Sequence, residues 1–152
     1  MNTAQTQRDA DTNLPANLLA EREVLGAVLE DDALLSEVIA SGLKVSHFAL
    51  TDHKLVFTAM LRLRERNHAI DLITLAEELG NRPESIALLC DLVTGVVLVR
   101  GHVLHHVGIV RRKARLRVLV KIGEQLAAAA NEDGADPSAL VQETLAGLEH
   151  TE

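Results

Sequence analysis

The sequence predicts an all-α fold, and three observations lead to this prediction. Hydrophobic residues make up 47% of the chain but aromatic residues only 1%, so the core must be built from Leu, Val, Ile and Ala. Leu and Ala favour helices, and the 152 residues include only three prolines. Strict polar/apolar alternation, which would indicate strands, is scarce. A chain of this length fits one domain of ordinary size.

Composition also excludes several classes of function. Cys90 is the single cysteine, which rules out an internal disulfide and a cysteine-based metal cluster. We expect it to be a small core residue. No apolar run approaches the ~20 residues of a membrane span, and the N-terminus lacks the pattern of a signal peptide, so we expect a cytoplasmic protein. A net charge of −7 disfavours general affinity for nucleic acid.

The first hundred residues are predicted to contain a tail and five short helices. Residues 1–13 have no apolar spacing and are expected to form a flexible tail. Capping residues then mark helix starts and ends. The expected starts are Asn17, Asp31 or Asp32, Thr51, Asp71 and Pro83, with Ser46 capping a turn that carries Phe48, and the expected ends are Gly42, Asn67 and Gly80. The segment 93–101 is predicted to be either a buried connection or a short extended piece.

A long helix is predicted over residues 102–130, with apolar residues spaced by three or four. A polar turn at 131–135 leads into a last helix, capped by Asp136 and started by Pro137. Two helices joined in this way form an antiparallel hairpin. Residues 118–122 are apolar over more than one stripe, which predicts a second partner, namely the same hairpin of another subunit. The candidate interface residues are Val103, Val107, Val110, Ala114, Val118, Leu119, Ile122, Leu126, Val141, Leu145 and Leu148.

The long helix carries a block of positive charge. No Asp or Glu occurs between Asp91 and Glu124, whereas seven basic residues do: Arg100, Arg111, Arg112, Lys113, Arg115, Arg117 and Lys121. At about 100° per residue these charges do not form one face, which favours a helix between acidic neighbours over one that tracks phosphates. Direct DNA contact is therefore not expected. Glu143, Glu149, Asp133 and Asp136 on the facing arm are candidate neighbours.

Motifs for catalysis are absent from the sequence. There is no Gly-Lys dipeptide, hence no P-loop, and no GxGxxG, HExxH or GxSxG. His102, His105 and His106 share a helix face. A polar helix start explains them better than a metal site, because zinc sites usually recruit a further Cys or carboxylate. His53 is expected to be a structural histidine packed beside Phe57. No catalytic, cofactor or metal site is predicted.

Four segments in order resemble the N-terminal domain of DnaB-type replicative DNA helicases. Residues 20–26 resemble its A-E-x-x-V-L-G signature, 48–53 its F-x4-H, 70–75 its I-D-L-x-T-L, and 110–117 its V-x6-R. The resemblance covers roughly residues 14–148. The matching residues, expected to be structural, are Ala20, Glu21, Val24, Leu25, Gly26, Phe48, His53, Asp71, Thr74 and Arg117.

The resemblance implies a small globular helical head, 14–101, followed by a helical hairpin, 102–150. In the family this domain forms the collar of a ring-shaped helicase: hairpins pair between subunits into a trimer of dimers, and primase and loader proteins dock there. ATP and Mg²⁺ would belong to a RecA-like motor domain, which is not present, so the chain itself is expected to have no enzymatic activity or cofactor. The chain is a piece of such a helicase or a free-standing relative. Two alternatives stay open: a helical regulator that binds DNA or a replication protein through its basic helix, and the helicase-interacting domain of a primase.

Overall fold

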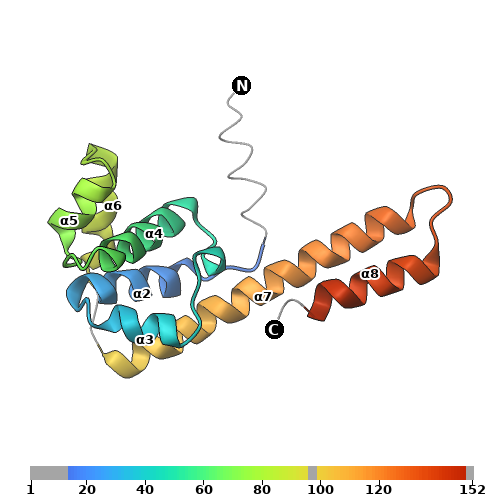
Figure 1. The fold of residues 1–152 in the computed structure, drawn as a ribbon, viewed down its shortest axis with the longest axis horizontal. Coiled ribbons are helices and arrows are strands. Elements are labelled where there is room, and N and C mark those ends of the chain that lie inside the picture. The colour runs from blue at the N-terminus through green and yellow to red at the C-terminus, as the bar shows by residue number, and fades with distance from the viewer. Residues whose placement is uncertain (1–13, 96–98, 150–152) are drawn as a thin grey trace. The chain divides into compact units, whose positions relative to one another are not determined.

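The structure, a computed structural model, describes residues 14–95 and 99–149 of the chain (Figure 1). These residues form helices and no strand, which confirms the all-α prediction. In order they are α2 (Leu18–Glu30), α3 (Leu34–Ala40), the 3-10 helix η1 (Val45–His47), α4 (Thr51–Glu65), α5 (Leu72–Glu78), α6 (Pro83–Val93), α7 (Arg100–Ala130) and α8 (Pro137–Glu149). The expected tail, residues 1–13, and part of the segment 93–101 lie outside the described residues.

Two compact units make up the chain: Asn17–Arg112, called the head below, and the described residues of Met1–Ala16 and Lys113–Glu152. The second unit contains the helical hairpin. The boundary falls inside α7 rather than at residue 101, where the sequence had placed it. The first three turns of the long helix belong to the head because their apolar residues complete the head's core.

The predicted helix caps were correct where the side chain of the capping residue accepts hydrogen bonds from backbone N–H groups of the helix that it starts. Asn17 Oδ1 accepts a hydrogen bond from the Ala20 N–H (3.0 Å) at the start of α2. Asp71 Oδ1 accepts from the N–H groups of Ile73 and Thr74 (both 2.9 Å), and Thr74 Oγ1 accepts from the Asp71 N–H (3.0 Å), which completes a capping box at α5. Pro83 is the first residue of α6. Left-handed backbone follows α3, α4 and α5 at Gly42, Asn67 and Gly80.

Three predicted caps were wrong. Neither Asp31 nor Asp32 caps α3, because its N-cap is Ala33. The Asp31 carboxylate instead accepts a hydrogen bond from the Ala33 N–H (Oδ1, 3.1 Å) within the tight turn between α2 and α3. Thr51 is the first residue of α4 rather than its cap, which is the extended Leu50. Ser46 lies inside η1.

The head is built around one aliphatic core. α2 packs against α4 and α6, α4 packs against α5, and α5 against α6. The rings of Phe48 and Phe57 lie 5.1 Å apart within the core. The core also contains Val103, Val107 and Val110 from the first part of α7. Cys90, predicted to be a core residue, is exposed instead, so that prediction was wrong.

In the second unit the later part of α7 and α8 run antiparallel (Figure 1). The two helices are in contact at Gly147 of α8: a Cβ atom built onto this glycine would lie 3.7 Å from Cδ1 of Ile122 on α7. A groove along this contact is lined by Ile122, Leu126, Ala129, Leu140, Thr144 and Gly147, among others. No residue of α8 is buried. None of the described helices is long and apolar enough to cross a membrane.

Candidate interaction surfaces

The family-motif residues of α2 and α4 meet in the head's interior. Glu21 is 1% exposed and His53 6%. Glu21 Oε2 lies 2.8 Å from His53 Nδ1, and Glu21 Oε1 accepts a hydrogen bond from the Ala49 N–H (2.7 Å). The His53 ring also meets Phe48 edge-on, with centroids 6.4 Å apart. Glu21 thereby links the middle of α2 to the start of α4, and the pair is closed off from solvent.

The other motif residues are also placed structurally. Ala20, Val24, Leu25 and Gly26 are buried along α2, and Asp71 and Thr74 form the capping box described above. Backbone N–H bonds to Asp71, above all from Thr74, lower the pKa of its carboxyl. Arg117 lies in the second unit, where its Nη1 donates to the Pro15 carbonyl (2.8 Å).

Part of the basic block is bound within the head. Arg100 forms ion pairs with Asp31 and Glu37. Arg111 Nη1 donates to the Ser41 carbonyl (2.7 Å), beside the C-terminal end of α3. These three contacts fasten the start of α7 to the end of α2 and to α3. They were not predicted, because their partners lie more than sixty positions away in the chain.

Three further basic residues of this block have no ion-pair partner within the part of the chain that the structure describes. Among the described residues, Lys113, Arg115 and Lys121 form no ion pair, and neither does Glu143 or Glu149. The predicted pairing across the hairpin is thus not found. Glu143 lines the groove together with Gln125 and Leu126 of α7. Asp136 instead accepts from the Ser138 N–H at the start of α8.

One side of the hairpin carries exposed apolar side chains. On α7 they are Leu116 (40% exposed), Leu119 (44%) and Val120 (37%), and on α8 Val141 (58%) and Leu145 (55%). Successive residues of a helix are about 100° apart around its axis. On each helix, the exposed apolar group therefore lies about 120° around the axis from the residues that contact the other helix, and the rotation has the same sense on both helices. Because the helices are antiparallel, equal rotations turn both groups to the same side of the hairpin. We call this set the outer face.

The eleven candidate interface residues therefore fall into different environments. Val103, Val107 and Val110 lie in the head's core, and Ala114 is also buried. Ile122 and Leu148 are half-buried, and Ile122 and Leu126 line the groove beside α8. The exposed members are Val118, Leu119, Leu126, Val141 and Leu145. Of these eleven residues, only members beyond Ala114 in the chain are exposed and available for association.

The head presents an apolar groove between α5 and α6. It has a volume of about 350 Å³ and is lined by Leu72, Ile73, Ala76, Ile86, Leu89 and Cys90, with the polar Glu77 and Asn81. The Ile73 side chain is 77% exposed. An apolar groove with a few polar groups at its margin can receive a partner's apolar side chains. The one signal in the sequence for this groove was overlooked: the adjacent apolar pair Leu72 and Ile73 at the start of α5.

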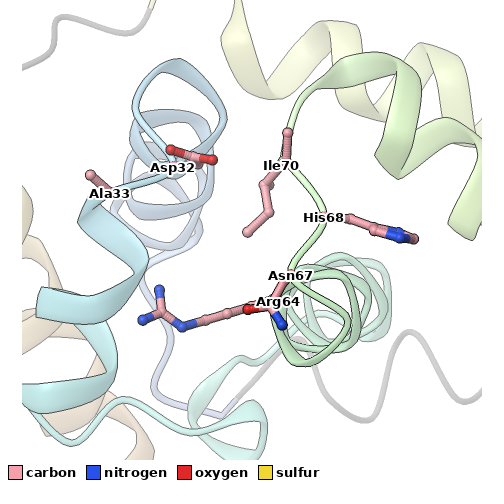
Figure 2. A pocket seen from close by; sticks show the side chains of 7 residues that line it. Asp32, Ala33, Arg64, Asn67, His68 and Ile70 are labelled. Carbon is pink, nitrogen blue, oxygen red and sulfur yellow. The ribbon is translucent and has the colours of Figure 1, made fainter.

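A second hollow of the head is polar. It lies between the α2–α3 turn and the loop after α4 and is lined by Asp32, Ala33, Arg64, Asn67, His68, Ala69 and Ile70 (Figure 2). Figure 2 shows the Arg64 side chain extended from α4 toward the α2–α3 turn. Asp32 supplies a negative charge to the same hollow, so the lining has no single sign and favours neither anions nor cations.

The three histidines at the start of α7 do not form a metal site in the described structure. His102 and His105 are exposed, His106 is half-buried, and the ring centroids of His105 and His106 are 6.2 Å apart. No group of three or more His, Cys, Asp or Glu side chains within residues 14–95 and 99–149 could hold a metal ion.

Comparison with known proteins gives the family. Residues 13–112 match the family described as "DnaB-like helicase N terminal domain". The replicative DNA helicase DnaC of Bacillus subtilis is 30% identical over 145 residues, covering 90% of this chain and 30% of the helicase. The DnaB helicase of Geobacillus stearothermophilus is 32% identical over 119 residues, covering 74% and 26%. The chain thus spans less than a third of the length of these relatives.

Solved structures agree with the sequence matches. The crystal structure of the N-terminal domain of DnaB helicase from Mycobacterium tuberculosis superposes with a TM-score of 0.79 at 28% identity, covering 91% of this chain and 99% of that one. A DnaB-like replicative helicase, solved in a study of its interactions with primase, shares the fold, with a TM-score of 0.73 at 21% identity over 90% of this chain and 32% of that one. The chain belongs to the family of DnaB-like helicase N-terminal domains.

Proposed function

We propose that this chain is the assembly and docking module of a replicative DNA helicase, and that it self-associates through the hairpin. The observation that carries this proposal is the outer face of the hairpin. Its five side chains, Leu116, Leu119, Val120, Val141 and Leu145, are each more than a third exposed and lie together on one side. A two-helix hairpin buries its remaining apolar stripe by forming a four-helix bundle with a second hairpin. Such a bundle is the unit from which a helicase collar is assembled.

Self-association is tested by multi-angle light scattering on the wild-type chain and two variants. Leu119→Asp places a carboxylate in the middle of the outer face, where a dimer would bury it without a partner at a cost of about 3–5 kcal/mol. The dissociation constant of the dimer should rise by about 100-fold or more. Ala128→Asp is the matched control: residue 128 is exposed on the same helix, about 130° away from the outer face, and its dimer should be unchanged.

Docking of a helical replication protein, the primase or a loader, is the second part of the proposal. It is supported by the apolar groove between α5 and α6, which leaves Leu72, Ile73 and Ile86 partly exposed on the head. Titration of the chain with the helicase-interacting domain of the cognate primase, followed by calorimetry, tests it. Ile73→Asp should weaken binding, whereas Ile39→Asp, at another exposed apolar site of the head, should not. Equal loss with both variants would argue against the groove.

The chain itself is proposed to be catalytically silent. It has no P-loop, so ATP and Mg²⁺ would act only in a motor domain joined to it. Purified chain should hydrolyse ATP no faster than a buffer blank. ATP hydrolysis above that background, in the same chromatographic fractions as the chain, would contradict this assignment.

Binding of DNA through α7 is the competing function. Lys113, Arg115 and Lys121, which form no ion pair in the described structure, favour an anionic partner of some kind. If the partner were DNA, affinity would fall steeply with salt, with a slope set by the number of phosphates neutralised. Our proposal predicts no binding to duplex or single-stranded DNA even at low salt.

A further inference from the structure

We propose that the turn between α7 and α8 contains a site of spontaneous chemical modification, at which Asp133 isomerises to isoaspartate through the nitrogen of Gly134. Both residues lie in this turn, and both are exposed. They form the single Asp-Gly dipeptide of the sequence, and no Asn-Gly dipeptide occurs. The inference is independent of the proposed self-association and docking, because it concerns only the covalent chemistry of this turn.

The reaction needs only the side chain of Asp133, the next backbone nitrogen and water. The nitrogen of Gly134 attacks Cγ of the protonated carboxyl, the N–H proton and the carboxyl's hydroxyl leave as water, and a five-membered succinimide ring forms. A water molecule then opens the ring at either carbonyl. Opening at Cγ restores aspartate, whereas opening at the main-chain carbonyl leaves the chain running through Cγ. The isoaspartate product has the same atoms as aspartate, one more carbon in its backbone and a free α-carboxylate.

The local structure leaves both reacting groups free. Within the described residues, the Gly134 N–H donates no hydrogen bond, and the Asp133 carboxylate forms neither a hydrogen bond nor an ion pair. Glycine has no Cβ to shield its nitrogen. Gly134 has a φ of 86°, a left-handed conformation that residues with a side chain rarely adopt. The turn therefore favours glycine at the position that makes Asp133 reactive.

The other aspartates of the described structure lack this combination. Asp136 precedes Pro137, whose nitrogen carries no hydrogen. Asp91 lies within α6, where the next backbone N–H belongs to the hydrogen-bond ladder of the helix. The carboxylate of Asp71 is held in the capping box of α5. Apart from Asp136, each is followed by a residue whose side chain crowds the attacking nitrogen. Isomerisation is therefore expected to be selective for Asp133.

Isomerisation at this position lengthens the turn that leads into α8. The Ala135 N–H donates to the Glu132 carbonyl (3.2 Å), and this hydrogen bond spans the linkage that gains a carbon. The helix that follows has no buried residue, so few contacts compensate for an altered turn. Segments with few buried contacts open locally more often than a packed core. The modified chain should therefore have a loosened α8 and an unchanged head.

Ageing of the wild-type chain for several weeks, at physiological temperature and neutral pH, tests the site. Peptide mapping with electron-transfer fragmentation distinguishes isoaspartate from aspartate. An isoaspartyl carboxyl methyltransferase counts the product independently, because it moves the methyl group of S-adenosylmethionine to the new α-carboxylate. We expect several times more isoaspartate at residue 133 than at any other aspartate, and an intermediate that is lighter by one water. Equal amounts at Asp133 and Asp91 would overturn the proposal.

Two substitutions at the same position separate chemistry from geometry. Asp133→Glu is the matched control: it keeps the charge, but its longer side chain would have to close a six-membered ring, which forms far more slowly, so its aged sample should contain no isomer at this position. Asp133→Asn closes the same five-membered ring with loss of ammonia and reacts faster, so it should convert to aspartate and isoaspartate. If Asp133→Asn survives ageing intact, the turn holds the Gly134 nitrogen away from Cγ and the proposal is wrong.

Amide hydrogen exchange of fresh and aged chains, compared at one concentration, tests the effect on the hairpin. Exchange in α8 should be several times faster in the aged wild-type chain, whereas exchange in α2 and α4 should not change. The aged Asp133→Glu chain should exchange like its fresh sample. Unchanged exchange in α8 of a chain that carries isoaspartate at residue 133 would refute the loosening of the hairpin.

Discussion

The head and the hairpin are both helical, but they bury their apolar residues to different degrees. The head places twenty-two hydrophobic residues in one core and closes it with the Glu21–His53 pair. In the hairpin, α8 has no buried residue, and large apolar side chains on both helices are more than a third exposed. Hydrophobic burial is the main favourable contribution to folding. The head therefore contains its own stabilising core, whereas the hairpin's remaining apolar surface would be buried only by association.

The two regions also treat charge differently. In the head, Arg22, Arg66 and Arg100 each form ion pairs, and Arg22 in addition donates to the Asp91 and Thr94 carbonyls at the end of α6. In the described part of the hairpin, no ion pair joins the two helices. Lys113, Arg115 and Lys121, which form no ion pair within the described residues, indicate where an anionic partner is expected.

The largest effect on the head should come from Glu21→Ala. The substitution removes the hydrogen-bond partner of the half-buried Ala49 N–H and of the buried His53 ring. Leaving a buried polar group without its hydrogen-bond partner costs about 1–3 kcal/mol. The free energy of unfolding, measured in urea, should fall by that amount, whereas Glu30→Ala, at an exposed site of the same helix, should change it little. Equal effects of the two variants would mean that the buried pair contributes nothing.

A smaller effect, and one that depends on pH, is expected at Asp71. Asp71→Ala removes the cap of α5 and should cost about 1 kcal/mol at neutral pH. Hydrogen bonds from backbone N–H groups lower the carboxyl's pKa in the fold, so the charged form stabilises the fold above the unfolded pKa of about 3.9. That contribution is lost as pH falls through the folded pKa. The difference between wild type and Asp71→Ala should shrink in acid, while Asp71→Asn keeps its cap throughout. A difference independent of pH would contradict this.

The smallest effect is expected at Arg100. Its ion pairs with Asp31 and Glu37 are at the surface, where the Arg100 side chain is 55% exposed. Exposed pairs contribute less than about 1 kcal/mol, and salt screens them. Arg100→Ala should lower the head's stability slightly at low salt and less at high salt. Arg112→Ala, which removes an exposed cation with no ion pair in the described structure, is the control; a loss as large there would show that charge alone is responsible.

Much of the fold followed from the sequence because its signals are local. Asn17, Asp71 and Pro83 start helices through bonds and backbone angles within one turn, and Gly42 and Gly80 end them in the same way. The apolar spacing of the long helix was also predicted, although not that its first part belongs to the head.

The features that the sequence missed depend on contacts between distant segments. The acceptor for Arg111 lies 70 positions away, and the bond that joins Glu21 to His53 links α2 to α4. Cys90 follows the apolar pattern of α6, but it is exposed at the groove between α5 and α6 rather than buried in the core. The groove between α5 and α6 likewise exists only after the two helices have packed. Periodicity identifies an apolar face, but it does not identify which element, or which molecule, covers it.

The central claim is that the head is stable by itself whereas the hairpin is stabilised by a second copy. Amide hydrogen exchange of the wild-type chain, measured by mass spectrometry over a range of concentrations, tests this most directly. We predict that exchange in α8 slows as concentration rises, in step with dimer formation measured by light scattering, while exchange in α2 and α4 stays constant. Equal protection of α8 at every concentration, in a chain that light scattering reports as monomeric, would contradict the account.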